Sequence, residues 1–280
     1  MKDIIKLMRT KHWIKNLLVF LPCFFNKTLT VSNALVLLLG ALAFSFVSSS
    51  IYCVNDIFDY KKDRLHDIKR NRPIASGRIS RKAAIALAAV LLILGLAIDL
   101  AFSMNKSHSV LLLLAYFVMN VAYSYKLKNY PIVDISILSL GFVFRVLYGG
   151  MLTDVQVSSM LALSVMIYSM YMALGKRRNE KQIMSDKSRQ VLKDYPVQYL
   201  DKCMYMCMAV GLVFYSIWAI SIDESMIITV FFVLIISLRY SLVLEGNNFG
   251  DPVDVLLNDK ILMILVLIYC VTVISIYMRL

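Results

Sequence analysis

Residues 55–63 read Asn55-Asp56-Ile57-Phe58-Asp59-Tyr60-Lys61-Lys62-Asp63 and lie between two long apolar segments, where a membrane helix would reach water. If the helix continues through them, Asp56, Asp59 and Asp63 stand at positions i, i+3 and i+7 on one face. Three adjacent carboxylates repel one another unless a cation neutralises them. Mg²⁺ prefers oxygen ligands and commonly joins carboxylates to substrate phosphates. On these residues alone, a magnesium site and a solvated charge cluster are equally good interpretations.

The composition identifies a polytopic membrane protein. Of the 280 residues, 60% are hydrophobic and only 17% are charged, whereas a soluble domain carries more charge. About 20 apolar residues suffice to span a bilayer. We therefore predict an all-α bundle forming a single domain over residues 1–280, with an interfacial helix at residues 1–13. The predicted spans are residues 14–26, 32–54, 83–104, 108–125, 132–152, 157–175, 201–221, 224–243 and 260–278.

The distribution of cations predicts the orientation. With the N-terminus inside, the cytoplasmic segments hold all of the 30 Lys and Arg residues except Lys27, Lys106, Arg145 and Arg279. This pattern follows the positive-inside rule, so the N-terminus and the acidic stretch are expected on the cytoplasmic side of the cell inner membrane. The formal net charge of +12 then favours anionic lipid and phosphate-bearing ligands. It does not indicate nucleic acid, because no basic domain stands outside the membrane.

The loop after the acidic stretch offers phosphate ligands. Lys69, Arg70 and Arg72 lie within ten residues of Asp63, and a proline and a glycine nearby favour a compact loop. Interleaved acids and cations suit a magnesium pyrophosphate, since the acids can hold the metal while the cations hold phosphate oxygens. A loop that only set the orientation would need the cations but not the ordered acids.

Three more cations are candidates for substrate binding. Lys15 enters the first span just after Trp13, where it either reaches back to the interface or faces a phosphate. Lys126 stands in a short cytoplasmic turn with a second cation and three tyrosines, so an interfacial anchor is an equally good interpretation. Arg145 lies near mid-membrane. A charge at that depth is costly and normally faces the bundle interior, so we expect Arg145 to line a polar cavity.

A second charged cluster follows the sixth span. Lys176, Arg177 and Glu180 share one helical turn at the start of a polar segment of about 25 residues. We expect residues 55–82 and 176–200 to form the two cytoplasmic active-site loops. Asp254 and Asp259, near the last span, are interpreted as residues that cap or flank a helix.

The motif Asn55-Asp56-x-x-Asp59-x-x-x-Asp63 at the end of the second of nine spans resembles the UbiA-type membrane prenyltransferase superfamily over essentially the whole chain. Most members carry a second motif, Asp-x-x-x-Asp, after the sixth helix, but this chain has Gly175-Lys-Arg-Arg-Asn-Glu180 there. That segment, Trp13-Ile-Lys-Asn, residues 66–77 and residues 251–259 are similar to the decaprenyl-phosphate phosphoribosyltransferase branch.

The resemblance implies a helical bundle open to the cytosol that uses Mg²⁺. In the branch, 5-phosphoribose moves from phosphoribosyl pyrophosphate (PRPP) to a long-chain polyprenyl phosphate that serves cell envelope biosynthesis. Asp56, Asp59 and Asp63 would then hold the magnesium pyrophosphate, with Asn55 beside them.

The other candidates receive roles by location. Lys69, Arg70 and Arg72 would contact the donor phosphates, and Glu180 would bind ribose hydroxyls or orient a cation. A second phosphate would be held by Lys15, Lys176 and Arg177. Two alternatives remain. One is a magnesium-dependent prenyltransferase that moves an isoprenoid from its diphosphate to an aromatic or lipid acceptor. The other is a non-catalytic transporter or channel in which the acidic cluster forms a cation-binding vestibule.

Overall fold

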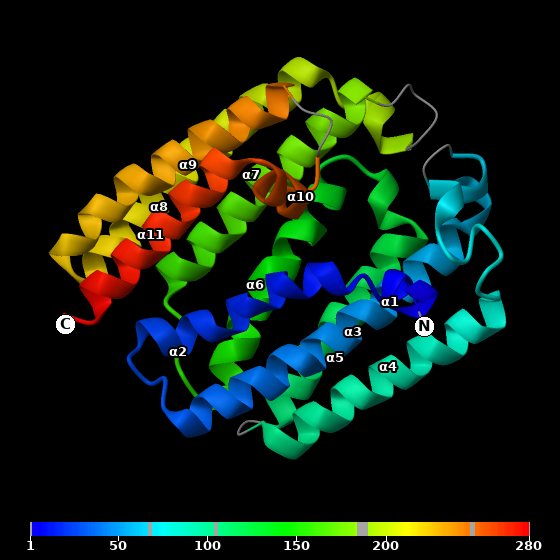
Figure 1. Cartoon of the computed structure of the whole chain (residues 1–280), viewed down its shortest axis with the longest axis horizontal. Coiled ribbons are helices and arrows are strands. Elements are labelled where there is room, and N and C mark those ends of the chain that lie inside the picture. Colours follow the sequence, from blue (N-terminus) through cyan, green and yellow to red (C-terminus); the bar gives the residue numbers. More distant parts are fainter. Residues whose placement is uncertain (1, 67–68, 104–105, 184–189, 247–249, 280) are drawn as a thin grey trace. The chain divides into compact units, whose positions relative to one another are not determined.

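The computed structural model describes residues 2–66, 69–103, 106–183, 190–246 and 250–279, and this part of the chain is helical with no strand. The predicted all-α membrane class is confirmed. Chain contacts separate two compact units, Met1–Val157 (unit 1) and Ser158–Leu280 (unit 2). The described helices long and apolar enough to cross a membrane are α3 (Val31–Arg64), α4 (Arg81–Phe102), α5 (Lys106–Tyr125), α6 (Val133–Thr153), α7 (Ser159–Ile183), α8 (Val197–Ile222), α9 (Ile227–Gly246) and α11 (Lys260–Tyr277) (Figure 1).

The first predicted span, residues 14–26, is not one continuous α-helix. After α1 (Lys2–Met8) the chain forms the 3₁₀-helix η1 (Thr10–Phe20) and then α2 (Leu21–Phe25). Pro22 stands in the first turn of α2, where its missing N–H leaves no helical hydrogen bond unmade. Because a 3₁₀-helix rises about 2.0 Å per residue, η1 and α2 together extend about 30 Å, close to the thickness of the hydrocarbon core. The segment is therefore long enough to cross the membrane.

This N-terminal segment runs antiparallel to α3 (Figure 1). Trp13 Nε1 donates to Ser49 Oγ at 3.0 Å, and Asn16 Nδ2 donates to Ser45 Oγ at 2.7 Å. The serines on α3 thus satisfy buried polar groups that have no water in the bilayer to pair with.

The core of unit 1 forms around α3, α5, α6 and η1. Its buried side chains are Val19, Cys23, Leu37, Phe44, Val47, Ile51, Leu112, Leu113, Tyr116, Tyr148 and Leu152. Close approach of η1 to α6 requires glycine at position 149, since a Cβ there would lie 1.9 Å from the carbonyl oxygen of Val19. This contact brings the N-terminal segment against α6.

Two membrane helices continue past the ends predicted for them. The spans were expected to end at residues 54 and 175, whereas α3 ends at Arg64 and α7 at Ile183. At about 1.5 Å per residue, α3 is about 51 Å long and exceeds the hydrocarbon core, so its acidic end extends beyond the span. Lysine, arginine and glutamate are good helix formers. The described charged residues at 55–64 and 176–183 are accordingly helical rather than in loops.

Short elements connect the long helices. Asp251 caps α10 (Pro252–Asn258) by accepting the Val253 N–H at 3.1 Å, and Asp259 caps α11 by accepting the Leu262 N–H at 2.7 Å. The capping role expected of Asp259 is therefore confirmed. The connecting elements are η2 (Lys69–Asn71), η3 (Leu127–Asn129), η4 (Gln190–Asp194), η5 (Glu224–Met226) and α10 (Pro252–Asn258).

Candidate functional site

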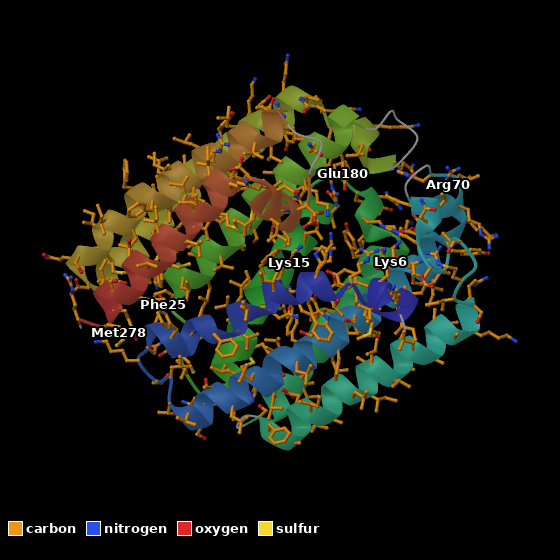
Figure 2. All side chains as sticks on the ribbon, in the orientation of Figure 1. Lys6, Lys15, Phe25, Arg70, Glu180 and Met278 are labelled. Carbon is orange, nitrogen blue, oxygen red and sulfur yellow. The ribbon has the colours of Figure 1, made fainter. Side chains whose placement is uncertain are left out.

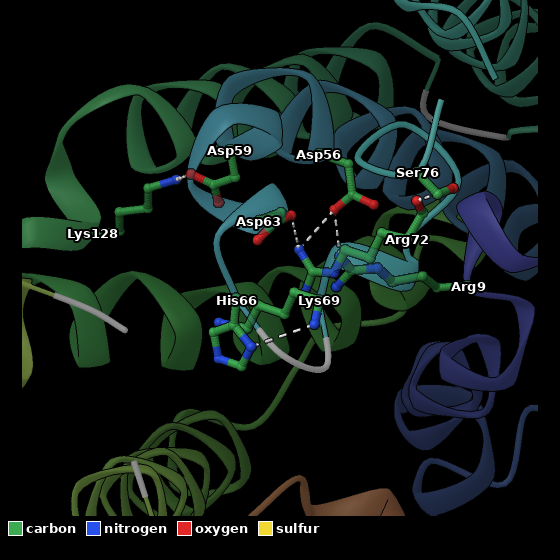
Figure 3. A network of polar contacts seen from close by, with 9 residues as sticks. All are labelled: Arg9, Asp56, Asp59, Asp63, His66, Lys69, Arg72, Ser76 and Lys128. Carbon is green, nitrogen blue, oxygen red and sulfur yellow. Dashed lines mark hydrogen bonds and ion pairs between the residues drawn. The ribbon is translucent and has the colours of Figure 1, made fainter. Parts of the chain in front are cut away.

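The three aspartates lie on the helical end of α3, as their spacing predicts, but their side chains point in two directions (Figure 3). Asp56 and Asp63 point toward Arg72, whereas Asp59 points toward Lys128. The acidic stretch therefore offers one pair of converging carboxylates and one separate carboxylate.

Arg72 joins the converging pair. Its Nη1 atom donates to Asp56 Oδ1 at 3.2 Å and to Asp63 Oδ2 at 2.8 Å. Both carboxylates are almost fully buried, with 3% and 6% of the side chain exposed. Burial raises the pKa of the Asp63 carboxyl above its ordinary value, and the guanidinium of Arg72 opposes that rise. The predicted proximity of Arg72 to the acidic motif is thus present in the structure.

Asp59 pairs with Lys128 rather than with Lys126. Lys128 Nζ lies 2.5 Å from Asp59 Oδ1, and the lysine side chain is only 9% exposed. Lys126 is exposed, with its ammonium 5.9 Å from the ring centre of Tyr130. Sequence spacing does not distinguish the two lysines. The fold distinguishes them, because the η3 turn places Lys128 against Asp59 of α3 and leaves Lys126 exposed.

Arg9 is a further member of this cluster, and no sequence motif marks it. Its Nη2 atom donates to Asp56 Oδ1 at 2.6 Å, and its guanidinium lies 4.7 Å from the ring centre of Tyr52. The residue connects α1 to η1 in a left-handed backbone conformation, with φ 52° and ψ 49°. In sequence, Arg9 looks like the other cations of an amphipathic N-terminal helix, so no local signal marks it.

The donor atoms of this cluster suit a hard cation. Asp56 and Asp63 already share one positively charged nitrogen, and Mg²⁺ needs only one or two carboxylates when waters and substrate phosphates complete its shell. In the part of the chain that the structure describes, no three His, Cys, Asp or Glu side chains gather as a ready-made metal cage. These residues therefore fit a metal bound together with a phosphate rather than one enclosed by protein alone.

The remaining candidates near the acidic motif and in the first span are Lys69, Arg70, Asn55 and Lys15. The backbone N–H of Lys69 donates to His66 Nδ1 at 3.4 Å, and Arg70 is exposed (Figure 2). Asn55 is half-buried directly before Asp56. The ammonium of Lys15 is 6.0 Å from the ring centre of Phe142, which is an aromatic contact.

Arg145 is buried within unit 1, with 5% of its surface exposed. Its Nε donates to Asn16 Oδ1 at 2.7 Å, its Nη1 donates to the Gly141 carbonyl at 2.5 Å and its Nη2 donates to the Tyr116 hydroxyl at 3.3 Å. The guanidinium also lies 4.7 to 5.5 Å from the ring centres of Phe44, Tyr116 and Phe142. Neutral acceptor oxygens and aromatic faces thus stabilise this charge.

Unit 2 carries the second charged cluster on the last turns of α7. Lys176 Nζ lies 3.0 Å from Asp251 Oδ2, and Arg177 Nη1 donates to Glu180 Oε2 at 2.8 Å. The predicted sharing of a helical turn by Arg177 and Glu180 is confirmed. Arg177 is 1% exposed, so the carboxylate of Glu180 is paired with a buried guanidinium.

Arg178 is a second charged residue that its position in the sequence does not distinguish from its neighbours. Its Nη2 donates to Glu245 Oε1 at 2.6 Å, its Nε contacts Asp201 and its Nη1 donates to Gln182 Oε1 at 3.0 Å. These contacts join α7 to α8 and α9. They hold the helix end that carries Lys176 and Arg177.

Two named relatives are similar to this chain over nearly its full length. A decaprenyl-phosphate phosphoribosyltransferase of Mycolicibacterium smegmatis is 31% identical, covering 96% of this chain and 91% of the relative. The protein of the same name from Mycobacterium tuberculosis is 29% identical, covering 96% of this chain and 92% of the relative.

The fold has a solved counterpart. The structure of a UbiA homolog from Archaeoglobus fulgidus bound to DMAPP and Mg²⁺ superimposes with a TM-score of 0.75 at 18% identity, covering 99% of this chain and 100% of that one. The model of the UbiA prenyltransferase family matches residues 16–249 of this chain. That match includes the acidic end of α3, the turn that carries Lys128 and the charged end of α7. The chain is therefore a multi-pass membrane protein that belongs to the UbiA prenyltransferase family.

Proposed function

We propose that this protein moves 5-phosphoribose from PRPP to a long-chain polyprenyl phosphate, giving polyprenyl-phosphoribose and pyrophosphate. One observation carries the proposal: Asp56 and Asp63 converge on a single guanidinium nitrogen of Arg72 at the end of a membrane helix. Such a site offers oxygens for a metal and cations for phosphates. The names and the full-length similarity of the mycobacterial relatives support PRPP and a polyprenyl phosphate as the two substrates.

The proposed reaction is a displacement at C1 of the ribose. A phosphate oxygen of the lipid forms the new bond to C1, and the bond from C1 to the pyrophosphate oxygen breaks. A phosphate monoester is already anionic near neutral pH, so the protein needs to position it rather than deprotonate it. When bound, Mg²⁺ would neutralise charge on the departing pyrophosphate. The cations of the chain would lower the repulsion between the two phosphorylated substrates.

The residues take the following roles in this proposal. Asp56, Asp59 and Asp63 would hold the metal, with Asn55 alongside. Donor phosphates would meet Lys69, Arg70, Arg72 and one cation of the η3 turn. For that cation we propose the buried Lys128 at Asp59 in place of the exposed Lys126. Lys15 in unit 1, and Lys176 and Arg177 in unit 2, are the candidates for a second phosphate, and Glu180 would orient Arg177 or bind ribose hydroxyls. Arg145 would line a polar cavity near the substrates.

The protein is proposed to act as one domain in the cytoplasmic membrane, with its N-terminus and site on the cytoplasmic side. The family match extends through both compact units, which supports a single functional domain. The positive-inside distribution of Lys and Arg supports the orientation. Anionic lipid at the cytoplasmic surface would contact the exposed cations of α1.

Transfer of a prenyl group is the second candidate. The family itself and a solved homolog bound to DMAPP and Mg²⁺ favour it. Against it, α7 ends in Lys176-Arg177-Arg178-Asn179-Glu180 where most members of the superfamily carry a second pair of aspartates. An isoprenyl diphosphate donor would be expected to use both acidic motifs.

A labelling experiment separates the two. Full-length protein in detergent receives Mg²⁺, ribose-labelled PRPP and a polyprenyl phosphate, and transfer of label to the organic phase is followed. We expect label to move, and to stop moving with Asp63→Asn or EDTA. Asp3→Asn, which alters a carboxylate in a surface ion pair, serves as the matched control. A parallel reaction receives an isoprenyl diphosphate and an aromatic or lipid acceptor in place of PRPP and the polyprenyl phosphate. If the ribose label stays in water while the isoprenyl diphosphate is consumed, the prenyltransferase proposal is correct instead.

A further inference from the structure

Arg9 reaches the acidic cluster through an unfavourable backbone conformation. Its φ of 52° and ψ of 49° lie in the left-handed region, where a residue with a Cβ is disfavoured. Such conformations persist only when surrounding contacts compensate, and they often mark functional positions. Here the compensating contacts are the 2.6 Å ion pair with Asp56 and the aromatic ring of Tyr52.

Counted over the residues that the structure describes, the acidic cluster is neutral. Three carboxylates face three cations: Arg9 and Arg72 contact Asp56, Arg72 also contacts Asp63, and Lys128 contacts Asp59. A divalent cation that entered this neutral cluster would leave two uncompensated positive charges in a partly buried place. Either a cation must withdraw from its carboxylate, or an anion must enter with the metal.

Arg9 is the cation best placed to withdraw. Arg72 bridges two carboxylates, and the side chain of Lys128 is only 9% exposed. Arg9 contacts a single carboxylate, its side chain is 23% exposed and it follows a helix of only seven residues. After Arg9 moves, Asp56 still keeps its contact with Arg72.

We propose that Arg9 is an exchangeable counterion of Asp56: it leaves that carboxylate when a divalent cation binds and then donates to a phosphate oxygen of the donor. The inference rests on the proposed function and adds Arg9 to the groups that hold the diphosphate. Guanidinium suits this exchange because it pairs equally well with carboxylate and phosphate. Metal and diphosphate then bind cooperatively through Arg9, and each strengthens the binding of the other by the same factor.

The test measures metal binding without turnover. Mn²⁺ is titrated into full-length protein in detergent and followed by electron paramagnetic resonance, with and without pyrophosphate, after correction for Mn²⁺–pyrophosphate in solution. Without pyrophosphate, Arg9→Gln should bind Mn²⁺ about tenfold more tightly than wild type, because a charge-assisted hydrogen bond no longer competes. The enhancement by pyrophosphate should be about tenfold smaller in Arg9→Gln. Lys2→Gln, which removes one charge from the exposed face of α1, should stay within about twofold of wild type in both conditions.

A second measurement uses the wild-type protein and does not depend on the folding of a variant. Mn²⁺ alone should increase backbone amide exchange at residues 6–10, where α1 loses its ion pair to α3, and pyrophosphate should then reduce it. Mn²⁺ affinity that is unchanged or weaker in Arg9→Gln, or exchange that does not respond to Mn²⁺, would overturn the inference.

The outcomes also separate this inference from the proposed function. If Mn²⁺ affinity and its enhancement by pyrophosphate change in Arg9→Gln as described, but no label moves from PRPP to the lipid, the exchange is supported and the proposed reaction fails. If label moves while Arg9→Gln leaves Mn²⁺ binding unchanged, the exchange alone fails.

Discussion

Replacing Arg72 with glutamine removes the positive charge that Asp56 and Asp63 share. The two acceptor oxygens lie within 3.2 Å of the same nitrogen, so they are no more than about 6 Å apart. At an effective dielectric constant of about 20, two unit charges at that distance repel by about 3 kcal/mol. Arg9 remains on Asp56 and offsets part of this repulsion. The expected loss in the free energy of unfolding is therefore about 2 kcal/mol at neutral pH, or roughly 5 °C in Tm.

The same variant should respond to metal more strongly than wild type. Mg²⁺ can neutralise the carboxylates that Arg72 leaves behind, so it should restore most of the lost thermal stability of Arg72→Gln and add less to wild type. Thermal unfolding in detergent, with Mg²⁺ or EDTA, measures both effects. Arg78→Gln is the matched control, because Arg78 lies in the same loop but pairs with Asp3 at the surface, where an ion pair contributes about 0 to 1 kcal/mol. The reasoning would be refuted if Arg72→Gln and wild type had the same Tm, or if Mg²⁺ did not raise the Tm of Arg72→Gln.

Three further predictions follow from single contacts. Gly149→Ala should lower stability by about 3 kcal/mol or more, because its Cβ would lie 1.9 Å from the Val19 carbonyl oxygen and the backbone must shift; thermal unfolding measures this. Lys128→Gln should weaken pyrophosphate binding about tenfold, measured by calorimetry with Mg²⁺ present, since it removes a buried cation at Asp59. The hydrogen bond from Arg239 lowers the pKa of Asp259. A carboxyl with a depressed folded-state pKa contributes stability above its unfolded pKa, near 4, and loses it as the pH falls through the folded value; Arg239→Gln should flatten the pH dependence of Tm between about pH 5 and 3.

Controls for these predictions come from the same elements. Gly141→Ala, also on α6, would place its Cβ at an ordinary contact distance of 3.4 Å from Tyr116, so its stability should change little. Lys126→Gln removes the same charge from the same turn at an exposed position and should bind pyrophosphate within about twofold of wild type. A larger loss in Lys126→Gln than in Lys128→Gln would reverse the assignment of the two lysines. If the pH dependence of Tm in Arg239→Gln equals that of wild type, the hydrogen bond from Arg239 is not what lowers the pKa of Asp259.

The sequence was sufficient for the class of fold and for the acidic face. Long apolar runs have no stable form in a bilayer other than a helix that satisfies its own backbone, so eight of the nine predicted spans appear as α-helices. The spacing of Asp56, Asp59 and Asp63 placed them along one helix end for the same local reason. The predicted ends of α3 and α7 came too early in the chain, because lysine, arginine and glutamate are good helix formers and can continue a helix into water.

The partners of the charges were decided by the tertiary structure alone. Lys126 and Lys128 are two residues apart in one short turn, yet only Lys128 contacts Asp59. Arg9 resembles the other cations of α1 in sequence and contacts Asp56 because the antiparallel course of η1 brings it there. Periodicity depends on neighbours along the chain, so it determines helices and their faces. An ion pair depends on two segments meeting in space, which is why the counterions of this site could be identified only once the fold was known.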